Sequence, residues 1–266
     1  MTKLSRYHMG SMNNIPEGVL LEILCAVPAC DLIHRCRLVC TLWRDTIDSP
    51  ALWKTKCHRD RFVSVRCKRS PPDWRMFYYL HLKKRNLLKN PNAAEKFKFW
   101  HKKENGGHHW KVETLPGEHG RPFSDEKVKK YFVTSFGMCL KSQTIDLKKE
   151  GYSPEFMDKV QPDIVIKDWY AARHDCGCEY RIIVQLLSQD HTVMAEFHPE
   201  PVYIEQWSNA EWSQIEYTFR NYGPGVRYIY FEHGGKDTQY WAGWYGIRVT
   251  SSSVMIDPGD LSTDIS

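Results

Sequence analysis

Six short runs of β-branched and aromatic residues in the second half of the chain limit what it can fold into. Gly, Pro, Asp and Asn separate the runs, which cover residues 164–170, 180–188, 192–198, 212–219, 226–233 and 247–256. Short strands at this spacing are typical of an antiparallel sandwich. Helical patterns in this half are confined to short stretches such as 124–132 and 147–160, which we predict to be helical. We therefore expect a β-sandwich here.

Residues 14–57 show helical spacing instead. The first helix is expected to start at Asn14 and Pro16 and to end at Pro28, with apolar positions at Leu20, Ile23, Leu24 and Val27. A second helix is expected to carry one apolar side formed by Leu32, Cys36, Val39, Cys40, Trp43 and Ile47. A third begins at Ser49, a capping residue followed by proline. Such small helices cannot bury their apolar faces alone, so we expect them to dock on a partner.

A basic segment follows the helices. Residues 54–89 contain twelve Lys and Arg against two Asp, although the whole chain has a net charge of only +5. Residues 73–90 are predicted to form a helix with Trp74, Phe77, Tyr78 and Leu82 on its inner face. The basic charge suits either an acidic partner or a solvated helix and loop, and we favour the solvated surface. We expect no nucleic acid partner.

The cysteines indicate a reducing compartment. All nine are scattered without the spacing of a disulfide framework, so we expect free thiols and a cytoplasmic location. Cys36, Cys40 and His34 lack a second pair of ligands, and we therefore expect no metal and no cofactor. No segment is apolar over enough residues to span a bilayer, so we expect no membrane insertion.

Catalysis is not expected. His174 with Asp175, and Glu232 with His233, are adjacent pairs, and adjacent residues of a strand point to opposite faces. The sequence shows no pair of carboxylates arranged for glycoside hydrolysis. The candidate nucleophiles have no basic partner at a recognisable spacing: Cys139, Cys176 and Cys178.

Residues 15–57 resemble the F-box. The stretch reads IPEGVLLEILCAVPACDLIHRCRLVCTLWRDTIDSPALWKTKC, with an Ile-Pro start, a second Pro, a Val-Cys-x-x-Trp helix and a final Pro-x-Leu-Trp. The resemblance implies docking onto the adaptor subunit of a cullin-RING ubiquitin ligase, whose cullin and RING subunits would then be indirect partners. The implied adaptor contacts are Ile15, Pro16, Leu20, Ile23, Leu24, Val27, Pro28 and Leu32. Val39 and Trp43 are expected to pack internally.

The second half resembles the F-box-associated domain of the F-box proteins that recognise glycoproteins. The similar segments are WKVETLPGEHG, KKYFVTSF, CLKSQTIDLKKEGY, PDIVIKDWYAARHDCGCEY, YGPGVRYIYFEHGGKDTQYWAGWYG and RVT. The resemblance implies a sandwich of the galactose-binding or jelly-roll type that binds the chitobiose core of high-mannose N-glycans. It further implies a non-catalytic receptor that directs misfolded glycoproteins to ubiquitination and endoplasmic-reticulum-associated degradation.

The loop QYWAGWYG, residues 239–246, supplies the aromatic rings that such a site needs. A sugar ring rests its apolar C–H face on an indole while nearby polar groups bind its hydroxyl and acetamido groups. By resemblance, Trp241 is the stacking face with Tyr240 beside it, Phe136 is a second apolar wall, and Asp175 is the acceptor. Trp244 and Tyr245 are expected in the core.

One position departs from the pattern. Some glycan-binding relatives have Lys directly after the Tyr-Trp pair, and this chain has Ala242. The missing cation predicts weaker or differently selective binding. The alternative is that the rings pack inward and the domain recognises protein substrates without glycan, through the same adaptor contact.

Together these expectations describe an α+β multidomain chain. A disordered tail at 1–11 precedes the F-box at 12–58, and a basic helical linker occupies 59–92. The antiparallel sandwich, at 93–257, is followed by a tail at 258–266.

Overall fold

A computed structural model describes residues 15–63, 71 and 73–257. The chain divides into a helical unit that ends at Lys83 and a second unit, Lys84–Asp257. The second unit thus includes residues 84–92, which were predicted to belong to the linker. The expected tails, the expected cap at Asn14 and much of the basic stretch between 64 and 72 lie outside the described residues.

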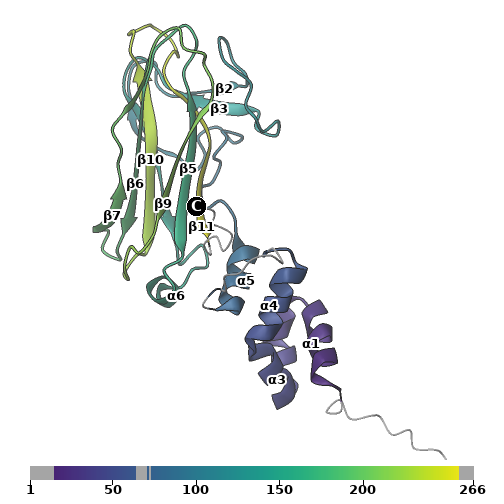
Figure 1. Cartoon of the computed structure of the whole chain (residues 1–266). Coiled ribbons are helices and arrows are strands. Elements are labelled where there is room, and N and C mark those ends of the chain that lie inside the picture. The colour runs from purple at the N-terminus through teal and green to yellow at the C-terminus, as the bar shows by residue number, and fades with distance from the viewer. Residues whose placement is uncertain (1–14, 64–70, 72, 258–266) are drawn as a thin grey trace, which may run out of the picture. The chain divides into compact units, whose positions relative to one another are not determined.

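The helical unit contains five α-helices in its described residues, α1 (Glu17–Ala26), α2 (Ala29–His34), α3 (Thr41–Asp48), α4 (Pro50–Arg59) and α5 (Trp74–Lys83) (Figure 1). The prediction of a single long helix from Leu32 to Ile47 is wrong. The chain leaves helical geometry at Arg35, forms a short 3-10 helix at Cys36–Leu38, and is extended at Cys40. Ser49 caps α4 as predicted, because its hydroxyl accepts a hydrogen bond from the backbone of Ala51 at 3.2 Å.

Helix α5 completes the core of this unit. Trp74, Phe77 and Tyr78 are buried as predicted, whereas Leu82 is exposed and Leu80 is buried in its place. The rings of Tyr78 and of the fully buried Trp53 on α4 have their centroids 5.5 Å apart. The helix after the basic segment is therefore a structural part of the helical unit.

The second unit is a sandwich of two antiparallel sheets, which confirms the predicted fold (Figure 1). One sheet has the order β1-β4-β10-β6-β7, with β8 also paired to β6, and the other has the order β2-β3-β11-β5-β9. The strands are β1 (His101–Asn105), β2 (Lys111–Thr114), β3 (Lys130–Val133), β4 (Cys139–Asp146), β5 (Asp163–Ala171), β6 (Cys178–Leu187), β7 (Val193–Phe197), β8 (Val202–Ile204), β9 (Ser213–Phe219), β10 (Tyr228–Asp237) and β11 (Arg248–Asp257).

All six predicted runs are strands, but the helical predictions in this half are partly wrong. Residues 124–132 end in β3, which pairs with both β2 and β11. Within 147–160 only α6 (Pro154–Lys159) is helical, and Ser153 caps it by accepting a hydrogen bond from the backbone of Phe156 at 3.2 Å. The helix does not begin earlier because residues 147–151 form a turn.

Strand register brings several loops to one end of the sandwich. In the first sheet, Asp237 at the end of β10 pairs with Cys178 at the start of β6. In the second, Arg248 at the start of β11 pairs with Val133 at the end of β3 and with Ala171 at the end of β5. Loops 134–138, 172–177 and 238–247 therefore meet at the same end. These loops carry the residues of the predicted glycan site.

Candidate functional site

A buried carboxylate, that of Asp237, fixes the backbone at the start of the loop between β10 and β11. Asp237 accepts hydrogen bonds through Oδ1 from the backbone N–H groups of Gln239 at 3.0 Å and Tyr240 at 2.6 Å. Burial raises the pKa of Asp237, and the backbone donors oppose that effect. Tyr240 adopts a left-handed φ of 58°. The two rings at the turn stay accessible, with Tyr240 73% exposed and Trp241 37% exposed.

The accessible indole is linked to the predicted acceptor through two residues, Tyr245 and Arg173. The Trp241 and Tyr245 rings meet edge to face, at 5.4 Å between centroids and 88° between planes. Because such a contact uses at most one face of each ring, Tyr245 leaves a face of Trp241 uncovered. Arg173 lies over the Tyr245 ring at 4.4 Å and donates to both oxygens of Asp175 at 2.9 Å. Trp241 and Asp175 therefore belong to one cluster.

Asp175 is an ionised acceptor. The hydrogen bonds from Arg173 hold its pKa below the ordinary carboxyl value, outweighing the opposing effect of burial. His119 Nε2 lies 3.9 Å from Asp175 Oδ2. Each carboxylate oxygen has more than one acceptor direction, so the bidentate Arg173 leaves capacity for a ligand donor.

Phe136 belongs to a neighbouring aromatic group. Its ring contacts His108 at 5.3 Å, and His108 in turn contacts Trp244 at 5.9 Å. Trp244 and Tyr245 are half-buried, so they are not the core residues that the sequence predicted. Trp244 Nε1 donates to the carbonyl of His109 at 3.1 Å. Since Trp244 and Tyr245 are adjacent, they join the Phe136 group to the Trp241 group.

The cations at this end come from positions outside the predicted glycan site. Ala242 is exposed and offers no donor. Lys236 Nζ lies 6.0 Å from the centroid of the Tyr240 ring, and Lys111 Nζ lies 4.1 Å from that of Trp244. Arg173 and Asp175 form an ion pair that places a positive group beside the acceptor. Their separation by two residues was the signal in the sequence that could have predicted this pair.

The predicted adaptor residues fall into two groups. Leu20, Leu24 and Leu32 are fully buried in the core of the helical unit, and Ile15 and Val27 pack against that core. The remaining members are at the surface: Pro16, Ile23 and Pro28.

Other exposed apolar residues were missed or misplaced. Val19, 50% exposed, lies one helical turn from Ile23, 46% exposed, and the two form an apolar surface on α1. Val39 is 58% exposed, so its predicted internal packing is wrong. It follows the exposed Leu38 in the break between α2 and α3.

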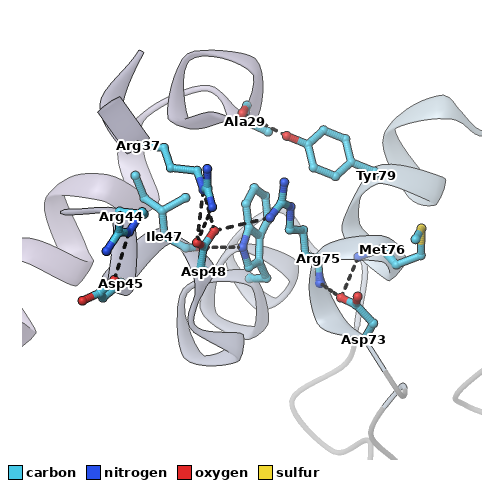
Figure 2. Close-up of polar contacts among 11 residues, drawn as sticks. Ala29, Arg37, Arg44, Asp45, Ile47, Asp48, Asp73, Arg75, Met76 and Tyr79 are labelled. Carbon is cyan, nitrogen blue, oxygen red and sulfur yellow. Dashed lines mark hydrogen bonds and ion pairs between the residues drawn. The ribbon is translucent and has the colours of Figure 1, made fainter. Parts of the chain in front are cut away.

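Polar contacts fix α5 to the other helices, as Figure 2 shows. Arg37 donates to Asp48 at 2.8 Å through both Nε and Nη2, and Arg75 on α5 reaches the same carboxylate at 3.4 Å. The hydrogen bonds from Arg37 lower the pKa of Asp48. The hydroxyl of Tyr79, also on α5, donates to the carbonyl of Ala29 at 3.0 Å.

The described residues offer no metal-binding group of three or more His, Cys, Asp or Glu side chains. The eight cysteines within those residues are free thiols. Over the same part of the chain, no helix combines the length and hydropathy needed to cross a membrane.

Both units match families of known proteins. Residues 12–59 match the F-box-like family and residues 78–256 match the F-box associated region. F-box only protein 6 of Bos taurus is 58% identical over 92% of this chain and 93% of its own length, and that of Homo sapiens is 56% identical over 96% and 87%. F-box only protein 44 of Mus musculus is 53% identical over 94% of this chain and 98% of its own. A xylan-binding domain from Paenibacillus barcinonensis aligns with a TM-score of 0.38 at 10% identity, over 65% of this chain and 96% of that one, which is too distant to indicate function.

Proposed function

Because the chain belongs to the F-box proteins that carry an F-box associated region, we propose that it is a substrate receptor of a cullin-RING ubiquitin ligase that binds the chitobiose core of high-mannose N-glycans. Its substrates are misfolded glycoproteins directed to ubiquitination and endoplasmic-reticulum-associated degradation. The observation that carries the proposal is the accessible Trp241 in one cluster with the ionised Asp175.

The site chemistry suits an N-acetylated sugar. The C–H face of a pyranose ring is apolar and lies against the uncovered face of Trp241, while Tyr240 lines the approach. The acetamido N–H and the hydroxyls need acceptors, and Asp175 supplies ionised oxygens that Arg173 holds in a fixed direction. Phe136 forms a further apolar wall, which His108 links to Trp244.

The receptor supplies recognition and no catalysis. Burial raises the pKa of the thiol of Cys139, and it raises that of Cys176 to about 12. A thiol is nucleophilic only as the thiolate, so these buried groups are poor acceptors for ubiquitin at neutral pH. Ubiquitin transfer is left to the other subunits of the ligase.

The adaptor surface lies on the helical unit. Pro16, Val19 and Ile23 form the exposed apolar surface of α1, and Leu38 and Val39 add apolar area at the break after α2. Exposed apolar residues grouped on a small helical unit mark a protein interface. Leu20, Leu24 and Leu32 act from the interior by holding α1 and α2 in position.

The two halves of the proposal are tested separately. A high-mannose glycoprotein, intact or stripped by an amidase that cleaves the glycan from Asn, is captured with the full chain. We expect the Trp241→Ala variant to lose the glycoprotein and to keep the adaptor subunit. The double variant Val19→Asp, Ile23→Asp should lose the adaptor and keep the glycoprotein. Phe99→Ala, which removes another exposed ring of the sandwich, should keep both.

Recognition of protein surfaces without glycan is the second candidate, and the absence of a donor at Ala242 favours it. Equal capture of the intact and stripped glycoprotein would establish this candidate and refute the first. If Trp241→Ala lost both partners together, the variant would be unfolded, and the less disruptive Tyr240→Ser would take its place.

A further inference from the structure

A second aromatic site lies on the loop between β2 and β3, which passes beside Asp175. This loop, residues 115–129 between β2 and β3, brings His119 beside Asp175 and is fixed there because His174 donates its backbone N–H to the carbonyl of His119 at 2.9 Å. Two residues later, Arg121 lines a separate groove of about 630 Å³. This volume is in the range of small-ligand sites.

The floor of the groove is built from three aromatic rings. Phe123 lies between Trp169 of β5 and Trp212, the residue before β9, with centroid distances of 5.4 and 5.3 Å and nearly perpendicular planes of 90° and 83°. All three rings are half-buried. The perpendicular contact with Phe123 leaves one face of Trp169 uncovered, whereas Trp212 also meets the ring of Tyr131 at 6.2 Å between centroids.

The groove is also preorganised. Trp212 Nε1 donates to the carbonyl of Arg121 at 3.1 Å, and Arg121 Nε donates to the carbonyl of Asn209 at 3.1 Å. Trp169 is held by strand pairing with Gln214 of β9. A ligand therefore meets a surface that is already ordered, which lowers the entropy cost of binding.

The polar groups at the groove point to a neutral ligand rich in hydroxyls. Arg121 provides donors and Glu211 provides acceptors, and their charges cancel. A phosphate or a nucleic acid backbone would require excess positive charge, which the groove lacks. Flat aromatic faces beside one donor group and one acceptor group match the apolar face and the hydroxyl rim of a hexose.

We propose that this groove binds mannose residues of the N-glycan whose chitobiose core occupies the Trp241 and Asp175 cluster. The inference rests on the proposed function and names the second part of its ligand. His119 and Phe123 are four residues apart, so their Cα atoms are at most about 14 Å apart. The mannose branches continue from the chitobiose over several rings, so one glycan reaches both sites.

The test compares two ligands on the full chain by calorimetry, chitobiose and a free high-mannose N-glycan. The wild type is expected to bind the glycan at least about 10-fold more tightly than chitobiose, because the second contact is intramolecular. Trp169→Ala is expected to leave the chitobiose affinity unchanged and to reduce the glycan affinity to nearly that of chitobiose. Phe99→Ala is the matched control and should change neither.

A milder variant protects the test against misfolding. The pair Arg121→Gln, Glu211→Gln keeps all three rings and should weaken glycan binding at least about 3-fold while chitobiose binding stays unchanged. Unchanged glycan affinity in both groove variants would overturn the proposal. A proline-rich peptide that bound the wild type, and was lost in Trp169→Ala at constant glycan affinity, would overturn it in favour of a peptide site.

Failure of the proposed function is distinguishable from failure of this inference. If chitobiose does not bind the wild type, an oligomannoside without chitobiose becomes the probe, followed by tryptophan fluorescence. Binding that survives Trp241→Ala and is lost in Trp169→Ala would support the groove on its own. No binding of this probe, after no binding of chitobiose, would refute both.

Discussion

Replacing Asp168 is expected to destabilise the sandwich more than any substitution of a surface charge. A fully buried row of polar groups crosses its interior, in which Lys141 Nζ lies 2.5 Å from His233 Nε2 and His233 Nδ1 lies 2.5 Å from Asp168 Oδ2. Tyr180 and Ser252 donate their hydroxyls to Asp168 at 2.6 and 2.7 Å. Asp168 therefore accepts hydrogen bonds from strands of both sheets.

The size of the loss in stability follows from the state of Lys141 in the Asp168→Asn variant. Burial lowers the pKa of Lys141, and the negative charge of Asp168 opposes that effect. In the variant, Lys141 is either an unpaired buried ammonium or a neutral amine that had to lose its proton on folding. Removing one partner of a buried pair costs about 3–5 kcal/mol. For a unit of this size, that corresponds to about 6–20 °C in Tm.

The sign of the pH dependence provides a second readout. If Lys141 is neutral in the folded variant and protonated in the unfolded chain, the unfolded state binds more protons. The free energy of unfolding then rises with pH, by at most about 1.4 kcal/mol per pH unit, until pH reaches the unfolded lysine pKa of about 10.4. The variant is therefore expected to gain stability on going from pH 7 to pH 9.

Urea unfolding of the full chain, followed by tryptophan fluorescence, measures these differences. Asp163→Asn is the control, because its ion pair with Arg220 is at the surface and contributes at most about 1 kcal/mol. The double variant Asp168→Asn, Lys141→Met removes the buried carboxylate and the buried amine of this row together and should be more stable than Asp168→Asn alone. Equal loss in Asp168→Asn and Asp163→Asn, or no recovery in the double variant, would refute the reasoning.

Three further predictions concern the site and its support. Ala242→Lys adds a donor beside Trp241 and is expected to tighten chitobiose binding about 3- to 10-fold in calorimetry, and an unchanged Kd would show that no sugar group is within reach. Since Arg173 lowers the pKa of Asp175, the affinity of the wild type for chitobiose should be constant from pH 7 to about pH 5. Arg173→Gln raises that pKa, so this variant should lose affinity as the pH falls toward about 4. Identical pH profiles of the two proteins would contradict this. Gly235→Ala places a Cβ 1.8 Å from the carbonyl oxygen of Glu179 at a φ of 153°, so its free energy of unfolding should fall by about 3 kcal/mol or more in urea, and near-wild-type stability would mean that the strands separate easily.

The strands that the sequence predicted best are those in which buried and partly exposed residues alternate. In β5, inward and outward positions alternate, and β-branched residues mark the run. β1 was missed because its sequence, HKKEN, is polar and almost entirely exposed at an edge of the sheet. Residues 124–132 were predicted to be helical from their local pattern. Pairing of β3 with two neighbouring strands overrides that local pattern.

The candidate site was predictable where single residues determine it. Two aromatic residues at a turn suffice to suggest an exposed platform, and Tyr240 and Trp241 are accessible. The contact of Tyr245 with Arg173 depends on the register between sheets, which no local pattern contains. In the helical unit, one apolar pattern marks both interior and surface residues, so sequence could not separate Leu20 from Val19.

The central claim is that the uncovered indole of Trp241 binds the sugar, and chitobiose titration followed by the tryptophan indole N–H signals tests it most directly. We predict a saturable shift of the Trp241 signal that is absent in Trp241→Ala. The signal of Trp53, whose Nε1 is bound to the carbonyl of Ile47 at 2.7 Å in the helical unit, should stay fixed. A Trp241 signal that does not move at saturating chitobiose would contradict the account.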